Sequence, residues 1–457
     1  MVPSISRREF LKYGTATLAT LATPAILAGC GSSPEPTSPP AAPTSAPAPT
    51  SPPAPDEVTF SLWSRYFWEP VGPVFEGFVS QFHEKYPGIT LENNVMGDSD
   101  YQSTIRVAMA SDDPPDLFYA YGGNWLKFFV EEGLVADVTP YWEQYGWKDR
   151  LNERALHGVK YGDKYYAVPT EITTAGIYYN KSIFEEAGIE PSEVPTWDEF
   201  LGYCEKIKAA GYQAMCLGNK DGGKAQWWWD YAVVRENGND YRRQVVRGEI
   251  PLNDKGIIAA LERTQADIFT NGNMNDDVNG LDIFGWLGMM AEGQTGMTLI
   301  HSFLPPQLIE AMMAEPYELG FFVYPQVHES IPIANDLYVE GNQAMSARNP
   351  YPDEGAKWLD FIISEEVQAE WAATSFIPTV EAVQDKLPAL TREVYDTVDQ
   401  YDSFAHLDLV FHPEIVSEIY ANYQSVLGGD MTPQEAMDAV QALAETLPWV
   451  GVPQGEA

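Results

Sequence analysis

The amino-acid sequence predicts an α/β protein with at least two lobes. The chain has 457 residues, of which 45% are hydrophobic, and this exceeds what the core of one simple domain requires. Strand-like and helix-like patterns alternate from residue 58 to residue 133. Such alternation is typical of a parallel, doubly wound sheet whose strands are joined by right-handed helical crossovers.

The first 55 residues are predicted to lie outside the folded lobes. Residues 6–12 (SRREFLK) match the twin-arginine export pattern, and residues 27–30 (LAGC) match a lipoprotein cleavage site. Residues 1–29 would then be a signal peptide, and Cys30 would carry the lipid. Residues 30–55 are rich in Pro, Ser and Thr and predict a semi-rigid tether. We therefore expect an extracytoplasmic protein anchored to the outer face of the cell membrane, in the periplasm if the cell has an outer membrane.

The elements of the first lobe follow from the hydrophobic pattern and its breaks. Residues 58–63 (VTFSLW) predict the opening strand, and Pro87-Gly88 end the first helix. An aromatic-rich turn of residues 64–68 separates the two. The pattern predicts helices at 71–85, 101–111 and 125–133, and strands at 58–63, 89–95 and 116–121.

The stretch from residue 161 to residue 200 predicts two strands and a helix. Residues 165–168 and 176–180 have strand character, and Pro169 between them predicts a broken corner. Thr196 and Glu199 form a capping box at the start of the helix, and Thr432 and Glu435 do the same for the last helix of the chain. Glu171 follows a strand end, the place where ligands gather in α/β proteins, and so it is a candidate hydrogen-bond acceptor.

Composition narrows the class of ligand. The net charge of −39 and the pI of about 4.3 exclude a nucleic-acid partner, because phosphates would be repelled. Aromatic residues make up 13% of the chain, with 13 tryptophans, and their flat faces favour a neutral ligand, although more than half of the tryptophans should be core.

No catalytic or cofactor motif is present in the sequence. The six histidines never stand at zinc spacing, and there is neither a Gly-x-Ser-x-Gly elbow nor a phosphate-binding glycine loop. Carboxylate pairs for glycoside hydrolysis can be drawn in many places, and nothing marks one of them. We therefore expect no enzyme, no cofactor and no metal. Cys204 and Cys216 are either a disulfide or two buried thiols.

Nine phrases spread in order over the chain resemble extracellular solute-binding proteins of bacterial carbohydrate ABC importers, the family that includes maltose-binding protein. They include HEKYPGITLE (83–92), ASDDPPDLFYA (110–120), YYAVPTEITTAGIYYNKSIFEEAGI (165–189), MMAEGQTGMTLIHSFLPPQL (289–308) and AKWLDFIISEEVQAEWA (356–372). The resemblance implies a two-lobed periplasmic-binding-protein fold, each lobe a sheet flanked by helices, with a ligand cleft between hinge crossings. The first lobe would comprise residues 56–138 plus 316–375, and the second 139–315 plus 376–457, with a return crossing at 319–325.

The resemblance also implies where the ligand would bind. The candidate ligand-binding residues on the first lobe are Trp63, Ser64, Arg65, Tyr66, Tyr121, Asn124 and Trp125. Those on the second lobe are Glu171, Trp227, Trp228, Trp229, His301, Ser302 and Phe303, with Asp336, Glu340 and Gly341 on a return segment. Relatives of the maltose-binding type carry Asp-Arg where this chain has Asn124-Trp125, so the identity of the ligand is not transferred.

These observations predict a monomeric, lipid-anchored binding protein. It would capture a sugar or oligosaccharide, close about a hinge, and present the ligand to the membrane permease of an ABC importer. Two alternatives remain: a protein of the same fold for a non-sugar solute such as a polyol, a peptide or a polyamine, and an extracytoplasmic glycoside hydrolase.

Overall fold

The computed structural model describes residues 57–313 and 317–452. The predicted signal peptide, the lipidation site Cys30 and the tether lie outside the described residues. Within the described ranges, no helix combines the length and the apolar character needed to cross a membrane.

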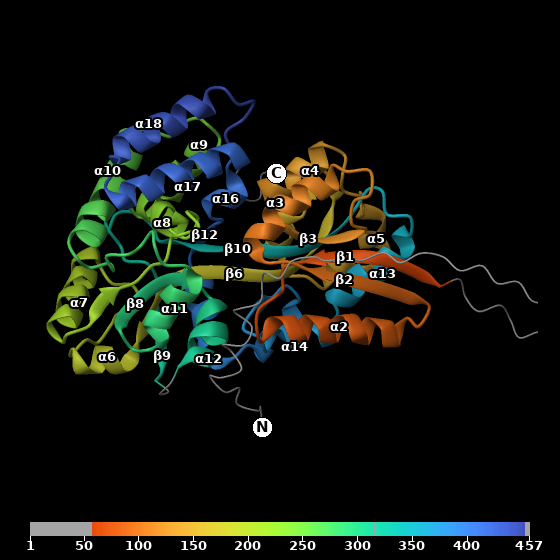
Figure 1. Ribbon diagram of the computed structural model, residues 1–457, viewed down its shortest axis with the longest axis horizontal. Helices are drawn as coiled ribbons and strands as arrows, with labels where there is room; N and C mark the ends of the chain where they lie inside the picture. The colour runs from red at the N-terminus through yellow and green to blue at the C-terminus, as the bar shows by residue number, and fades with distance from the viewer. Residues whose placement is uncertain (1–56, 314–316, 453–457) are drawn as a thin grey trace, which may run out of the picture. The chain divides into compact units, whose positions relative to one another are not determined.

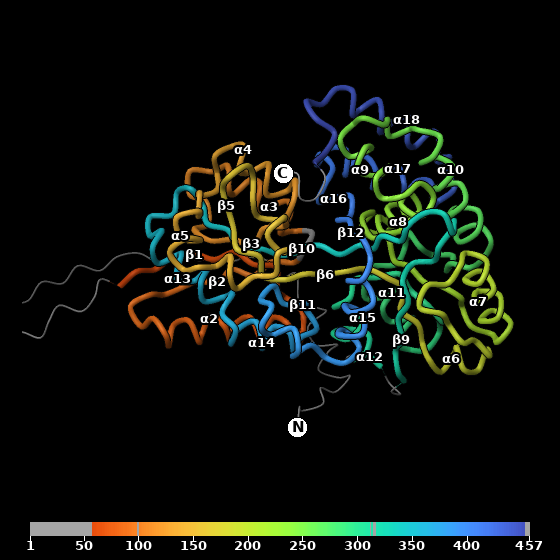
Figure 2. The backbone as a smooth tube through the Cα atoms, turned by 180° about the vertical axis from the view of Figure 1, so that it is seen from behind, coloured from red at the N-terminus to blue at the C-terminus, as the bar shows by residue number. Residues whose placement is uncertain are grey.

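Two long strands organise the fold, β6 (Ala167–Asn180) and β10 (Ala334–Met345). They pair antiparallel with each other (Figures 1 and 2), and each also pairs with further strands on either side. The hydrogen-bonded order along the sheet is β2-β1-β3-β10-β6-β8-β7. Every residue of β10 is buried, as is every residue of β6 except Tyr179, so both strands run through the core.

The first group of elements surrounds three parallel strands, which confirms the predicted parallel arrangement. β1 (Val58–Ser64) lies between β2 (Ile89–Val95) and β3 (Leu117–Tyr121). Figure 1 shows α2 and α14 on one side of these strands and α3 and α4 on the other. The helices of this group are α2 (Val71–Lys85), α3 (Asp98–Met109), α4 (Asn124–Glu131), α5 (Thr139–Tyr145), α13 (Pro352–Ile362) and α14 (Glu365–Ala372).

The second group surrounds the other half of β6. There β6 pairs with β8 (Thr295–His301) and β9 (Leu319–Phe322), and β7 (Gln213–Met215) lies parallel to β8. The helices of this group are α6 (Lys181–Glu186), α7 (Trp197–Ala209), α8 (Gln226–Asn237), α9 (Asn239–Val246), α10 (Lys255–Thr264), α11 (Ile283–Ala291), α12 (Glu310–Met312), α15 (Ala389–Asp399), α16 (Leu407–Val410), α17 (Pro413–Gly428) and α18 (Pro433–Ala444). Short strands complete the set: β4 (Lys160–Tyr161), β5 (Lys164–Tyr165), β11 (Ile377–Pro378) and β12 (Asp402–Phe404).

Both predicted capping boxes are confirmed. Thr196 Oγ1 accepts from the backbone N–H of Glu199 at 3.3 Å, and Glu199 Oε2 accepts from the backbone N–H of Thr196 at 2.8 Å. Thr432 and Glu435 repeat this pair of bonds at the start of α18. Each box satisfies two backbone donors that the first turn of a helix leaves free.

The predicted break at Pro169 is wrong, because β6 continues through it as one strand. The register against β10 shifts next to Gly341, where Asn342 faces Pro169. An irregular site of this kind tolerates a residue that has no backbone N–H to give to the ladder. The strand that joins the two groups is also not the one expected at residues 319–325. β9 lies there and pairs with β6 at Ile177–Asn180, within the second group. β10 joins the groups instead, because it pairs with β3 of the first group and with β12 of the second.

Cys204 and Cys216 are two separate buried thiols, which decides between the alternatives that the sequence left open. Burial raises the pKa of each thiol to about 12. Both side chains therefore act as small apolar core residues rather than as nucleophiles.

Candidate ligand-binding site

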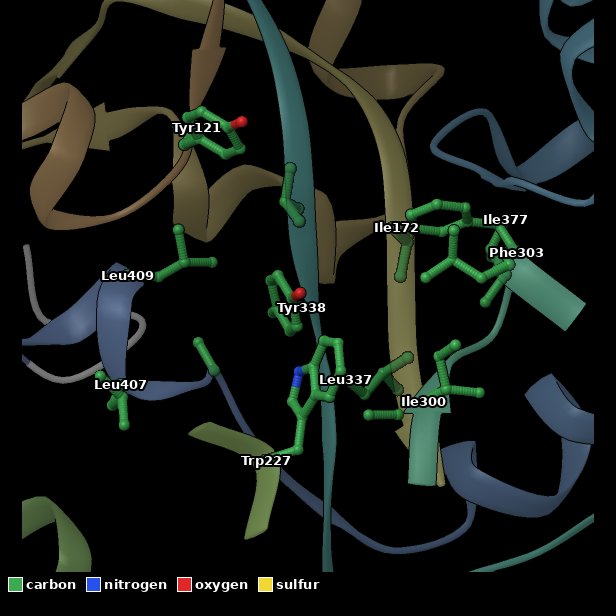
Figure 3. Packing of buried hydrophobic residues seen from close by; sticks show 14 of the residues in the cluster. Tyr121, Ile172, Trp227, Ile300, Phe303, Leu337, Tyr338, Ile377, Leu407 and Leu409 are labelled. Atoms are coloured by element: carbon green, nitrogen blue, oxygen red, sulfur yellow. The ribbon is translucent and has the colours of Figure 1, made fainter. Parts of the chain in front are cut away.

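A cavity of about 390 Å³ opens beside the middle of β10. Its lining comes from both groups of elements: Arg65, Trp68 and Tyr121 from the first group, and Trp227, His301 and Phe303 from the second. Figure 3 shows Tyr121, Tyr338 and Trp227 along β10, with Phe303 on the far side of β6. A volume of this size lies within the range of small-molecule sites.

Aromatic rings form two sides of the cavity. Trp68 and Phe303 stack with their ring centroids 6.4 Å apart, and Trp68 Nε1 donates to Gln307 Oε1 at 2.9 Å. Trp227 packs on the imidazole of His301 at 4.3 Å. The buried Nε1–H of Trp227 has no hydrogen-bond partner among the described residues. A buried N–H without a partner is unfavourable, so a ligand acceptor at this position would satisfy it.

Arg65 supplies the fixed charge of the opposite side. Its Nη2 donates to Glu340 Oε1 at 3.1 Å and lies 3.6 Å from Glu171 Oε1. The guanidinium also lies over the rings of Tyr119 and Tyr121, at 4.8 and 5.3 Å from their centroids. These contacts hold Arg65 in one orientation.

Glu171 is completely buried behind Arg65 and does not line the cavity. Its carboxylate accepts from Tyr119 Oη at 3.2 Å and from Tyr66 Oη at 3.4 Å. Burial raises the pKa of Glu171 to about 7, although Arg65 acts in the opposite direction. In the structure it lies against Arg65 and does not line the cavity, where the sequence-based prediction had placed it as a direct ligand acceptor.

Tyr338 connects Glu340 to His301 at the floor of the cavity. Its hydroxyl donates to Glu340 Oε2 at 2.6 Å and lies 2.9 Å from His301 Nε2. Burial lowers the pKa of His301 well below its ordinary value, and the nearby His406 adds to this shift. His301 is therefore a neutral imidazole at neutral pH.

His406, which follows β12, lies between two carboxylates. Its Nε2 is 2.7 Å from Asp408 Oδ1, and its Nδ1 is 3.6 Å from Asp336 Oδ2. Burial alone would lower the pKa of His406, but the two carboxylates raise it well above its ordinary value. Burial raises the pKa of Asp336 to about 6, and Asp408 is the carboxylate nearer to His406.

A second cavity of about 300 Å³ adjoins the first and shares Gln102, Tyr121 and Asp408 with it. Trp125 from α4 and Tyr420 from α17 line it. The Nε1–H of Trp125 also has no hydrogen-bond partner within the described ranges. The two cavities therefore share part of their lining.

The structure brings seven of the predicted site residues to these two cavities: Arg65, Tyr121, Trp125, Trp227, His301, Phe303 and Glu340, with Tyr121 lining both and Trp125 only the second. Among the three consecutive tryptophans, Trp227 is the one that faces the cavity.

The other predicted site residues line neither cavity: Trp63, Ser64, Tyr66, Asn124, Glu171, Trp228, Trp229, Ser302, Asp336 and Gly341. Trp228 packs on Phe269 and Tyr324, and Trp229 on Phe411, because a helix directs consecutive side chains to different faces. Asn124 donates to the carbonyl of Val410 and so joins α4 to α16.

The prediction missed Trp68, Lys224, His406 and Asp408. Trp68 belongs to the aromatic-rich turn after the first strand, and that position could have indicated it. His406 and Asp408 carry no local pattern, because they reach the cavity only through the return of the chain beside β10.

The arrangement defines a binding fold of two element groups that share a cavity beside strands common to both. The chain matches the family model of bacterial extracellular solute-binding proteins over residues 68–369, well over half of its length, and it belongs to that family.

Two relatives and one solved structure illustrate the match. An uncharacterized ABC transporter extracellular-binding protein of Pyrococcus horikoshii is 26% identical over 66% of this chain and 68% of its own. The multiple sugar-binding protein of Streptococcus mutans is 23% identical over 62% of this chain and 66% of its own. A chitin oligosaccharide binding protein has the same fold, with a TM-score of 0.79 at 20% identity over 86% of this chain and 99% of that structure.

Proposed function

We propose that this solute-binding protein captures a sugar or oligosaccharide and delivers it to an ABC importer. The cavity beside β10 carries the proposal: Trp68, Trp227 and Phe303 offer aromatic faces, while Arg65 and Glu340 offer fixed polar groups. Aromatic faces cover the C–H faces of a sugar ring, and charged groups make the stronger hydrogen bonds to its hydroxyls. The name of the Streptococcus mutans relative supports the same class of ligand.

The second cavity favours a ligand of more than one sugar unit. Its shared residue Tyr121 would lie between two units, and Trp125 would meet the second. Together the cavities offer about 390 and 300 Å³, whereas a single sugar ring would occupy only the first.

The proposal includes the signal peptide, the lipid anchor, the tether and the two lobes that the sequence predicts. Residues 1–29 would be removed, Cys30 would carry the lipid, and residues 30–55 would tether a monomer outside the membrane. The lobes would comprise residues 56–138 plus 316–375 and residues 139–315 plus 376–457, with their bounds shifted where β9 pairs within the second group and α5 packs with the first. Ligand contacts from both lobes would favour the closed form. The permease of the importer would recognise that form.

Titration calorimetry on protein lacking residues 1–30 tests the proposal. We expect a saccharide to bind with micromolar affinity, equivalent to about −8 kcal/mol, and a di- or trisaccharide to bind at least tenfold more tightly than its monosaccharide. Equal affinities for the monosaccharide and the longer saccharide would contradict the proposal that the ligand has more than one sugar unit.

The same titration separates the alternatives. A panel of polyols, short peptides and polyamines serves as the comparison, because Asp100, Asp221 and Asp282 also line the cavity and would attract an amine. Binding of an amine with no response to any saccharide would overturn the sugar proposal. Chromatography of the saccharide after incubation should show no product, and a cleaved product would indicate a hydrolase.

A further inference from the structure

Three side chains at the floor of the first cavity can share one metal ion. His301, Glu340 and His406 each offer a nitrogen or oxygen atom, and these atoms lie within 4.8 Å of one another. All three side chains are buried, and all three line the cavity. They come from β8, from β10 and from the segment after β12, so no local spacing in the sequence could reveal them.

His406 already has the carboxylate neighbour that a metal-binding histidine usually has. Metal-bound imidazoles almost always direct their second nitrogen to a carboxylate or carbonyl, which fixes the ring. Here one nitrogen of His406 lies 2.7 Å from Asp408 and the other 3.6 Å from Asp336. Whichever nitrogen turns to the metal, a carboxylate remains beside the other.

Asp336 is an independent observation that favours a cation at this place. The side chain is completely buried, yet neither of its carboxylate oxygens accepts a hydrogen bond from any described residue. The contact to His406 at 3.6 Å is longer than a hydrogen bond. A buried carboxylate without donors is costly, and a second positive charge nearby would reduce that cost.

The side chains of Glu340 and His301 are already held in place by other residues. The Tyr338 hydroxyl lies 2.6 Å from Glu340 Oε2 and 2.9 Å from His301 Nε2, so it holds both side chains toward the same point. Arg65 binds the other oxygen of Glu340 at 3.1 Å. Its positive charge opposes a metal, but Glu171, Asp336 and Asp408 add three further carboxylates to the same buried region.

We propose that His301, Glu340 and His406 form a site for a divalent transition-metal ion, zinc by preference, at the floor of the ligand cavity. Two imidazoles and one carboxylate are a donor set that zinc accepts in sites where a fourth position stays open. Because all three ligands line the cavity, that open position faces the bound solute, and a hydroxyl or carboxylate oxygen of the solute would fill it.

Metal titration of the chelator-treated protein, with no sugar present, tests the site. Co²⁺ serves as the spectroscopic probe and Zn²⁺ as the competitor. We expect one Co²⁺ per chain, visible absorption bands of a low-coordinate nitrogen–oxygen site, and their loss when one equivalent of Zn²⁺ is added. His301→Gln and Glu340→Gln should each weaken binding at least tenfold. His157→Gln, at an exposed histidine away from the cavity, should bind as the wild type does.

His301→Gln is the decisive variant, because it leaves the two carboxylate contacts of His406 in place. Melting curves in chelator check that each variant is folded before titration. No stoichiometric metal binding by the wild type, or wild-type binding by the folded His301→Gln variant, would overturn the proposal and leave a protonated His406 as the only cation between Asp336 and Asp408. Since the titration contains no saccharide, its failure would leave the sugar proposal standing, and a failed sugar titration would leave the metal site standing.

Discussion

The side of the cavity formed by Arg65 (the first side) and the side formed by Trp227 (the second side) are built in different ways. On the first side, Arg65 is held by Glu340 and Glu171, and Tyr119 and Tyr121 lie under its guanidinium. On the second side, Trp227 is held by apolar packing, and its polar Nε1–H has no partner among the described residues.

This difference between the two sides predicts that one contributes mainly to the stability of the fold and the other mainly to ligand affinity. On the first side, other side chains of the protein already pair with the charged groups. That side is therefore a prearranged frame, and removing one of its charged groups would destabilise the fold. The second side leaves a donor for the ligand to satisfy, so that side should contribute more to affinity than to stability. Variants on the two sides can test this division.

The largest effect is expected for Arg65→Met. The variant keeps a long apolar stem but leaves Glu340 and Glu171 without their cation. Breaking a buried ion pair from one side typically costs about 3–5 kcal/mol, and chemical unfolding should show a loss of that size. Saccharide affinity should fall in the same variant.

Arg65→Lys is the matched control, because lysine keeps the positive charge but lacks the planar guanidinium that lies over Tyr119 and Tyr121. It should recover part of the stability lost in Arg65→Met. Full wild-type stability in Arg65→Met would show that the first side is not a frame.

The second prediction concerns the pH dependence that Glu171 imposes on the first side. Burial raises the pKa of Glu171 to about 7 from an ordinary value of 4.5. The folded state therefore binds more protons than the unfolded state between pH 4.5 and 7, and the contribution of Glu171 to stability falls as the pH rises through that window. Relative to the wild type, Glu171→Gln should gain up to about 3 kcal/mol from pH 4.5 to pH 7 and little more above pH 8.

Urea unfolding of both proteins at pH 5, 6, 7 and 8 measures this difference. The exposed Glu132→Gln is the control, and its difference from the wild type should stay small throughout. Parallel curves for Glu171→Gln and the wild type would show that Arg65 keeps Glu171 ionised across the whole range.

The sequence predicted the first lobe well because its elements follow local rules. The strands at 58–63 and 89–95 and the capped helix after Thr196 depend on alternation, breakers and caps within a few residues. Pro169 was misjudged because its missing N–H is tolerated only through the register shift at Gly341, far away in the chain.

The site was predicted less completely, since its geometry depends on distant contacts. Arg65 and Trp227, which line the cavity, were predicted from their positions after a strand end and in an aromatic run. The burial of Glu171 depends on the pairing of β6 with β10 at Gly341, where Glu171 Oε1 lies only 2.3 Å from the point that a Cβ would occupy. The approach of His406 to His301 joins segments about a hundred residues apart, which no local pattern describes.

The smallest effect is expected on the second side, for Trp227→Phe. Phenylalanine keeps an aromatic face beside His301 but lacks the Nε1–H that has no described partner. If the ligand accepts from this N–H, its loss should weaken saccharide binding by about tenfold, equivalent to about 1.4 kcal/mol, with little change in melting temperature. Trp229→Phe is the control, because Trp229 is buried against Phe411 outside the cavity; it should lower the melting temperature and leave the affinity unchanged. The same changes in affinity and melting temperature in both variants would show that the second side does not contribute to affinity independently of stability.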